Sequence, residues 1–194
     1  MQRSPGQSPP LSSTPAWKRA DLLAEASALP VARRYAPLLS QSFLSICGPT
    51  SVANVLRSIG VPAGKNPLPG IGLRPMSLDQ LVRESAAVVP APWTVRAVRP
   101  SSSDELRAHL RESNDERVRL VANFSRAPLF GRGGGHHSPI GGYLEREDLA
   151  LVLDVNAGFG PWLVDTERLF LAMSTVADWS TGLTRGLARF EAPR

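Results

Sequence analysis

The fold is constrained most by three runs of apolar residues in the second half of the chain, at 118–124, 140–144 and 150–155. Each run has the length and composition of a strand. Only the short polar segment 145–148 separates the second run from the third. Because parallel strands need a much longer crossover connection, these two are predicted to pair antiparallel. Shorter strands are expected at 94–98, 162–164 and 187–191.

A helix is predicted to begin next to Cys47, since Pro49 is tolerated in a helix only in its first turn. An apolar stripe with the spacing of one helix face follows, and Gly60 fits the end of the helix. The stripe consists of Val52, Val55, Leu56 and Ile59. Further helices are expected at 16–29, after Ser77, at 104–112, and after Asp165 or Thr166.

Helical patterns dominate the first half of the chain and antiparallel strands the second, which is typical of an α+β fold. The 194 residues suffice for one domain with a substantial core. Residues 1–15 are rich in Ser, Pro and Gln and carry too few apolar side chains to order themselves. We therefore expect a flexible tail and a short helix within 1–28, and the main domain at 29–194.

Composition narrows the classes of partner and compartment. A single cysteine excludes an intramolecular disulfide and a thiolate metal cluster. The net charge of +5 comes from scattered arginines without a dense basic run, so we expect no nucleic-acid partner. No apolar stretch reaches the length of a membrane span, and no secretory signal is seen at the N-terminus. The expectation is a cytoplasmic protein with no membrane partner, with export as the alternative.

Cys47 is the first candidate for chemistry. The positive end of a helix dipole favours a thiolate over a thiol, which is how a cysteine becomes a nucleophile near neutral pH. The other interpretation is a small buried hydrophobe, because free cysteine is among the most buried residue types. Gln41, shortly before Cys47, could donate its side-chain amide to an oxyanion.

His136 and His137 follow three glycines and open a strand, which would place an imidazole at a cleft. Asp154 ends the most apolar strand, where a buried carboxylate needs a partner. An imidazole of the neighbouring strand would provide one, and the result is a Cys-His-Asp nucleophilic arrangement. Alternation along the strand does not select between the two histidines.

Simpler interpretations of these residues stay open. One histidine could lie on the surface and the other be packed, and Asp154 could cap a turn. A metal site made by both histidines with Asp154 is weaker, because adjacent strand residues point to opposite faces. His109, between Arg107 and Arg111, is interpreted as a surface residue.

Two motifs lie in the second half of the chain. The first is Gly135-His136-His137-Ser-Pro-Ile-Gly-Gly-Tyr143, and the second is Leu-Val-Leu-Asp154-Val. Both resemble motifs of phytochelatin synthases, a branch of the papain-like cysteine peptidases. In that match His136 takes the position of the catalytic histidine and His137 a variable position. Three further blocks follow the family pattern in the right order. They are Gln41 with Cys47-Gly48, Asn123-Phe124 with Arg126, and Asp178 with Arg185-Gly186.

The resemblance implies a papain-like fold, with the nucleophile at the N-terminus of a central helix packed on an antiparallel sheet, and a catalytic domain at 29–194. It implies glutathione as the substrate, attack by Cys47 with His136 as base and acid, and Asp154 fixing the imidazole. Asp178 and Arg185 would hold the charged γ-glutamyl end, since an acid and a guanidinium match its two charges. Arg126 is implied as a third substrate-binding residue. No cofactor or metal ligand is implied, although a metal thiolate such as cadmium–glutathione could be a co-substrate, and a homodimer stays open.

The chain departs from the family pattern after Asp154. The segment 156–162 lacks the basic and tyrosine side chains found there in the family, and we expect no cysteine-rich extension like that of the plant members. We therefore expect hydrolysis of glutathione to γ-glutamylcysteine, with weak transpeptidation to phytochelatin at most. The alternatives are a papain-like peptidase or amidase acting on another peptide, and a binding protein that has lost turnover.

Overall fold

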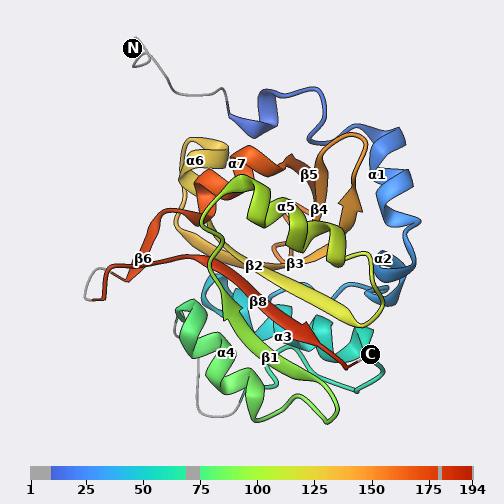
Figure 1. Cartoon of the computed structure of the whole chain (residues 1–194), viewed down its shortest axis with the longest axis vertical. Helices are drawn as coiled ribbons and strands as arrows, with labels where there is room; N and C mark the ends of the chain where they lie inside the picture. The colour runs from blue at the N-terminus through green and yellow to red at the C-terminus, as the bar shows by residue number, and fades with distance from the viewer. Residues whose placement is uncertain (1–9, 69–74, 179–180, 194) are drawn as a thin grey trace.

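The computed structural model describes residues 10–68, 75–178 and 181–193 of the chain (Figure 1), without the side chain of Asp178. Its centre is a six-stranded sheet in the order β1-β8-β2-β3-β4-β5, and all neighbouring strands are antiparallel. The strands are β1 (Thr94–Val98), β2 (Val118–Ser125), β3 (Gly135–Leu144), β4 (Leu149–Leu153), β5 (Pro161–Asp165) and β8 (Gly186–Glu191). A two-stranded ribbon, β6 (Val176–Asp178) with β7 (Leu183–Thr184), lies beside it. The predicted antiparallel sheet is confirmed.

Helices cover both faces of the sheet, because successive strand residues alternate between two apolar clusters. Figure 1 shows α5 (Ser103–Glu112) and α7 (Thr166–Met173) in front of the sheet and α3 (Cys47–Ser58) behind it. The front cluster contains Leu106 and Phe124, and the rear cluster Val55 and Val121. α4 (Leu78–Ala86) packs against β1 and β8, and α1 (Ala20–Ser27) against β3, β4 and β5.

The helix next to Cys47 follows the sequence pattern closely. η2 (Leu44–Ile46), a short 3₁₀ helix, leads directly into α3, which begins at Cys47 itself. Pro49 lies in the first turn, and Gly60 adopts φ +86° just beyond the end, a conformation that glycine reaches at little cost. The central helix and its position on the sheet are therefore as predicted.

The N-terminal part differs from the prediction. Residues 1–9 of the expected flexible tail lie outside the described residues, but η1 (Leu11–Ser13) packs on the domain, and Leu11 is only 2% exposed. Trp17 accepts a backbone hydrogen bond from Leu163 at 3.0 Å. The flexible assignment is thus wrong for residues 10–15, because one leucine inserts into the core from an otherwise polar segment. α2 (Pro30–Arg34), which starts with proline, is an additional helix.

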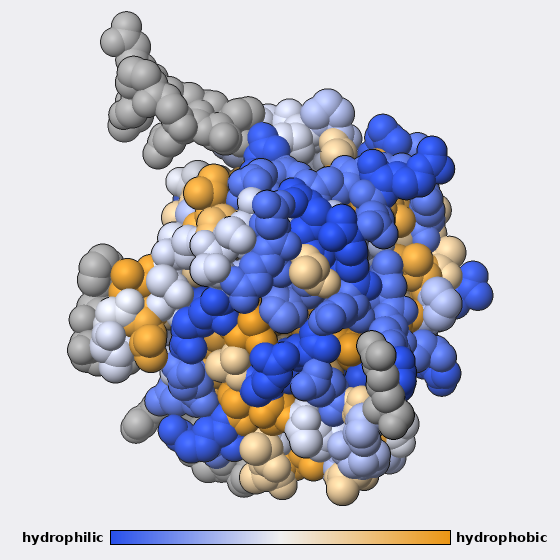
Figure 2. All heavy atoms as spheres, in the orientation of Figure 1, coloured by the Kyte–Doolittle hydropathy of each residue, from blue (hydrophilic) through white to orange (hydrophobic). Residues whose placement is uncertain are grey.

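The surface seen in Figure 2 is mostly hydrophilic, and apolar side chains reach it only in small areas. Among the described residues, no helix combines the length and apolar character that crossing a membrane requires. α6 (Arg126–Phe130) follows β2 directly and brings Arg126 toward the start of β3.

Candidate active site

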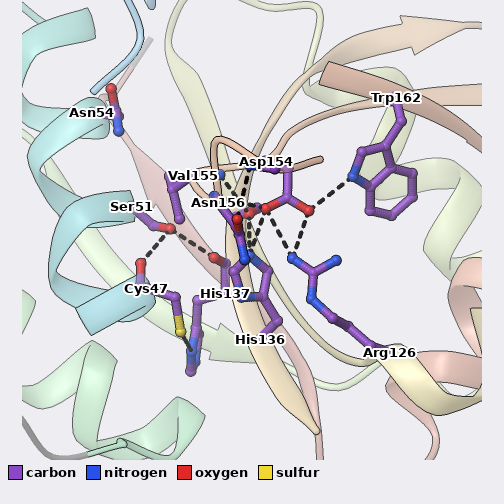
Figure 3. Close-up of polar contacts among 12 residues, drawn as sticks. Cys47, Ser51, Asn54, Arg126, His136, His137, Asp154, Val155, Asn156 and Trp162 are labelled. Carbon is purple, nitrogen blue, oxygen red and sulfur yellow. Dashed lines mark hydrogen bonds and ion pairs between the residues drawn. The ribbon is translucent and has the colours of Figure 1, made fainter. Parts of the chain in front are cut away.

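Cys47 lies at the junction between α3 and the sheet. Its side chain is buried, with 8% of the residue exposed. It lies at the N-terminal end of α3, where the first backbone N–H groups have no partner within the helix. Ser51, one turn further along, joins the helix to β3. Its Oγ lies 2.7 Å from the carbonyl oxygen of Cys47 and 3.0 Å from that of His137 (Figure 3). The nucleophile candidate is therefore fixed against the strand that carries both histidines.

His136 and His137 are both buried, at 4% and 3% exposure, and point to opposite faces of β3. His136 pairs with Phe124 of β2 and His137 with Asn123. The imidazole of His136 contacts the Phe124 ring edge-on, with 5.5 Å between the ring centres. The two imidazoles therefore have different surroundings.

A bulge in β3 decides which histidine faces which side. The pairing of β3 with β4 shifts between Ile140 and Gly142, where Gly142 has φ +139°. As a result Ile140 and Tyr143, an odd number of residues apart, both belong to the front cluster. Regular alternation back from Tyr143 would instead have turned His137 to the front. The sequence left this choice open, and the structure places His136 on the side of Phe124.

Asp154 follows β4 directly and is almost fully buried, with 1% exposed. His136 Nε2 lies 2.9 Å from Asp154 Oδ1, and Arg126 Nη2 lies 2.9 and 2.7 Å from the two oxygens (Figure 3). The indole Nε1 of Trp162 donates to Oδ2 at 2.9 Å, and the backbone N–H of Asn156 donates to Oδ1 at 2.9 Å. The buried carboxylate is thus surrounded by donors.

These donors stabilise the charged form of Asp154. Burial by itself would raise the pKa of this carboxyl. The hydrogen bond from His136, the charge of Arg126 and the hydrogen bond from Trp162 outweigh burial and lower the pKa to about 2. Ser138 Oγ lies 2.9 Å from His136 Nε2, on the same side of the strand. Because a carboxylate only accepts, His136 carries a proton on Nε2, and its Nδ1 is left for Cys47.

The thiol of Cys47 faces both imidazoles. Its Sγ lies 3.8 Å from His137 Nδ1. Burial raises the pKa of Cys47, but hydrogen bonding to His136 and then to His137 lowers it to about 5. Burial lowers the pKa of His136, yet hydrogen bonding to Asp154 and to Cys47 raises it above the ordinary value. The lowered pKa of Cys47 and the raised pKa of His136 together favour a thiolate–imidazolium pair near neutral pH.

Two cavities flank this pair. A cavity of about 820 Å³ on the His136 side is lined by Gln41, Arg126, Phe159 and the glycines before β3. A cavity of about 530 Å³ on the other side is lined by Cys47, Asn123, His137 and Arg185. The reactive groups therefore lie between two spaces that could each hold one part of a substrate.

The remaining residues predicted from the sequence are distributed over these cavities. Gln41 is fixed by its backbone N–H, which donates to Val155 O at 2.7 Å, and its side-chain Oε1 is buried with no partner among the residues that the structure describes. Arg185 Nε donates to Thr175 Oγ1 at 3.0 Å. The guanidinium of Arg185 lies so close to Gly135 that a Cβ there would meet Nη1 at 2.5 Å, so any side chain at this position would displace the guanidinium. The side chain of Asp178 lies outside the described part of the chain.

Arg126 was expected to bind substrate, and the structure brings its Nη2 onto Asp154 instead of into open space. Its other terminal nitrogen, Nη1, is buried and has no hydrogen-bond partner within the described part of the chain. His109 is partly buried near Arg189, away from the two cavities. Among the described residues, no group of three or more His, Cys, Asp or Glu side chains is arranged to hold a metal ion.

The sequence analysis missed Trp162 and Ser138 as partners of the site. A signal existed for Trp162, because a buried indole usually finds an acceptor for its N–H and Asp154 is a nearby buried carboxylate. Ser138 gave no such signal, since a serine on a strand is equally compatible with either face.

Comparisons with known proteins agree with this geometry. Residues 68–187, more than half of the chain, match the family model described as phytochelatin synthase. The glutathione gamma-glutamylcysteinyltransferase 1 of Triticum aestivum is 30% identical over 166 residues, or 76% of this chain and 33% of that protein. The protein of the same name from Lotus japonicus is 30% identical over an aligned region that covers 79% of this chain and 34% of that protein. The chain thus spans about a third of the length of these relatives.

The structure is also similar to the peptidase domain of Streptococcus ComA, a bi-functional ABC transporter. That likeness has a TM-score of 0.55 at 18% identity and covers 81% of this chain and 98% of the other. At this identity the likeness concerns the fold alone. The α+β papain-like fold expected from the sequence is confirmed.

Proposed function

The chain belongs to the phytochelatin synthase family, and we propose that it cleaves glycine from glutathione through a γ-glutamylcysteinyl thioester on Cys47. One observation carries the proposal. Hydrogen bonding to His136 and His137 lowers the pKa of the Cys47 thiol to about 5, and His136 Nε2 is held 2.9 Å from Asp154. A thiolate paired with an oriented imidazolium is the arrangement that acyl transfer requires.

In the first half of the reaction, the thiolate attacks the cysteinyl carbonyl carbon of glutathione. The developing oxyanion would be met by Gln41 and by free backbone N–H groups at the start of α3. The C–N bond to glycine breaks, and His136 gives its proton to the leaving amine. Asp154 keeps the imidazole in the required tautomer and stabilises its charged form.

The acyl group would occupy the cavity shared by Cys47 and Arg185, with Arg185 pairing with the carboxylate of the γ-glutamyl end. Asp178 is proposed to pair with the amino group of the same end. Glycine would leave through the larger cavity on the His136 side. Arg126 is proposed to act mainly by holding Asp154, because its Nη2 lies on both carboxylate oxygens.

In the second half of the reaction, we propose that water is the main acceptor. The segment between Asp154 and Trp162 is short, and Phe159 lies against Arg126, with 3.9 Å from the guanidinium carbon to the ring centre. The cavity next to His136 is therefore lined here by an aromatic ring, and it lacks the basic and tyrosine side chains of the family that could bind a second glutathione. Transpeptidation is proposed to be weak, with or without cadmium–glutathione as a co-substrate, and no cofactor is proposed.

The test is mass spectrometry of the products after incubation with glutathione, with and without cadmium. We expect glycine and γ-glutamylcysteine from the native chain and neither from a Cys47→Ala variant. Longer (γ-Glu-Cys)n-Gly products would show that a second glutathione is admitted after all. Unchanged glutathione in every sample would contradict the proposed substrate and favour a different peptide.

A further inference from the structure

We propose that His137 is a second catalytic base at Cys47, which takes a proton from the water that hydrolyses the thioester. The inference rests on the proposed function and assigns a role to a residue in a variable position of the family motif. It follows from where His137 lies, from which of its nitrogens is free, and from the cavity that it lines.

The first step is proximity to the reacting atoms. His137 Nδ1 lies 3.8 Å from Cys47 Sγ, and its ring is buried. In the acyl-enzyme the carbonyl carbon is bonded to Sγ, so Nδ1 is within reach of a water beside that carbon. Reacting groups held this close need no further encounter step.

The second step is the tautomer. Asn123 Nδ2 lies 3.5 Å from His137 Nδ1 and 3.3 Å from the carbonyl oxygen of His136. The carbonyl oxygen requires a donor, so the amide nitrogen of Asn123 faces both groups, and an amide N–H only donates. In the acyl-enzyme Cys47 is a thioester and no longer a thiolate that accepts from Nδ1, so neutral His137 then keeps its lone pair on Nδ1 and its proton on Nε2. The nitrogen nearest to the thioester is the one that can accept a proton.

The third step is the unused nitrogen. His137 Nε2 is buried and has no hydrogen-bond partner among the described residues. A buried N–H without a partner is costly, and such groups are found where a ligand or water completes the site. His136 offers no comparable atom, because its Nε2 has both Asp154 and Ser138 beside it.

The fourth step is access. His136 lines the larger cavity, which is the proposed exit of glycine, whereas His137 lines the cavity with Cys47 and Arg185. The acyl group extends from Cys47 toward Arg185 within this cavity, so water would reach the thioester through the part of the cavity next to His137 while glycine still occupies the His136 side. The two histidines would then serve two acceptors: His136 the amine of glycine, and His137 water.

The reaction step balances without another reactant. An O–H bond of water breaks, its proton goes to His137 Nδ1, and the oxygen forms a bond to the thioester carbonyl carbon. The C–S bond then breaks, its electron pair returns to Cys47 as the thiolate, and γ-glutamylcysteine leaves with its new carboxyl group. His137 finally releases the proton to solvent.

The experiment measures how the acyl-enzyme divides between glycine and water. The native chain is incubated with glutathione and isotopically labelled glycine, and two rates are followed by mass spectrometry. Exchange of label into glutathione reports attack by glycine, and γ-glutamylcysteine reports attack by water. The variants are His137→Phe, which removes both nitrogens, and His137→Gln, which keeps a hydrogen-bonding group but no base. His109→Gln is the matched control, because it removes a histidine far from both cavities.

In both His137 variants we expect hydrolysis to fall by about 10²-fold or more, the usual contribution of a general base, while label exchange changes far less. The ratio of exchange to hydrolysis should be that of the native chain in His109→Gln. Equal losses of exchange and hydrolysis would overturn the proposal and assign His137 to activation of the thiol. Native hydrolysis in His137→Gln would also overturn it, because hydrogen bonding would then suffice. Absence of exchange and hydrolysis in the native chain would instead contradict the proposed function itself.

Discussion

The two sides of Cys47 are built differently, although they begin from adjacent residues of one strand. On the His136 side, Asp154 collects hydrogen bonds from His136, Arg126 and Trp162. On the His137 side, Cys47 and Asn123 are the only described residues within hydrogen-bonding range of the imidazole, and Nε2 has no partner among them.

The difference shows how one site can hold one base rigid and leave another available. A buried carboxylate must be surrounded by donors, and those donors fix the orientation of His136 as a consequence. The single amide next to His137 sets its tautomer in the acyl-enzyme, while Nε2 is left without a partner among the described residues. We expect substitutions on the saturated side to have large effects on both stability and turnover, and substitutions on the other side to change mainly the fate of the acyl group.

The largest effect is expected from Asp154→Asn. Loss of the charge that orients and stabilises the His136 imidazolium should lower kcat/KM for glycine release by about 10²–10⁴-fold. Arg126 would be left buried without its counter-ion, which should lower the free energy of unfolding by roughly 3–5 kcal/mol. Activity assays and urea unfolding measure the two effects. Asp21→Asn, the same change at an exposed residue, should alter neither.

The stability of the fold in acid provides a second test of the charged Asp154 on the His136 side. Because the pKa of Asp154 is lowered to about 2 in the folded chain, its carboxylate stabilises the fold at every pH above the ordinary pKa of an aspartate. This contribution is lost as the pH falls through about 2. The difference in stability between the native chain and Asp154→Asn should therefore shrink as the pH falls from 5 toward 2, roughly the range between the two pKa values. A difference that stays constant over this range would contradict the charged state assigned to Asp154.

The two histidines can be compared through the reactivity of Cys47. The thiolate, the reactive form, should predominate above a pH of about 5, so alkylation by iodoacetamide should remain fast at pH 6 and slow down below 5. His136→Gln should raise the midpoint of this profile more than His137→Gln, because the hydrogen bond to His136 is the largest single cause that lowers the pKa of Cys47. The reverse order would show that His137 is the main partner of the thiolate.

A smaller effect is expected from Trp162→Phe. The phenyl ring keeps the edge-on contacts with Phe124 and Phe130 but cannot donate to Asp154. Loss of one hydrogen bond to a charged group should cost roughly 1.5–3 kcal/mol of stability and about tenfold in glycine release. Trp17→Phe is the control, since Trp17 belongs to the same aromatic cluster and lies 6.5 Å from Trp162, measured between ring centres. Equal losses in the two variants would mean that packing, not the hydrogen bond, explains the effect.

The smallest effect is expected from Asn123→Leu, which keeps the volume but removes the amide that sets the tautomer of His137. Its hydrogen bonds are long, at 3.3 and 3.5 Å, so stability should change by less than about 1 kcal/mol. Hydrolysis should fall a few-fold, with glycine release in the first turnover unchanged. A loss of glycine release as large as that in Asp154→Asn would remove the distinction between the two sides.

The sequence by itself determined the local elements and the identity of the candidate residues. The start of α3 at Cys47 follows from Pro49 and the apolar stripe, and the β3–β4 hairpin follows from two apolar runs with a short polar turn. These signals are local, because they depend on neighbours within a turn of helix or across a tight hairpin. The family motifs in turn indicated Cys47, His136 and Asp154 without any knowledge of their distances.

Only the tertiary structure decided the faces and the partners. The bulge between Ile140 and Gly142 turns His136 toward Asp154 and His137 toward Cys47 and Asn123, and a shift of one residue is invisible to an alternation pattern. The bonds of Arg126 and Trp162 to Asp154, and the insertion of Leu11 into the core, join segments far apart in the chain. Such contacts depend on how the sheet and the helices pack together, and that packing is decided by the whole chain and not by any one stretch of it.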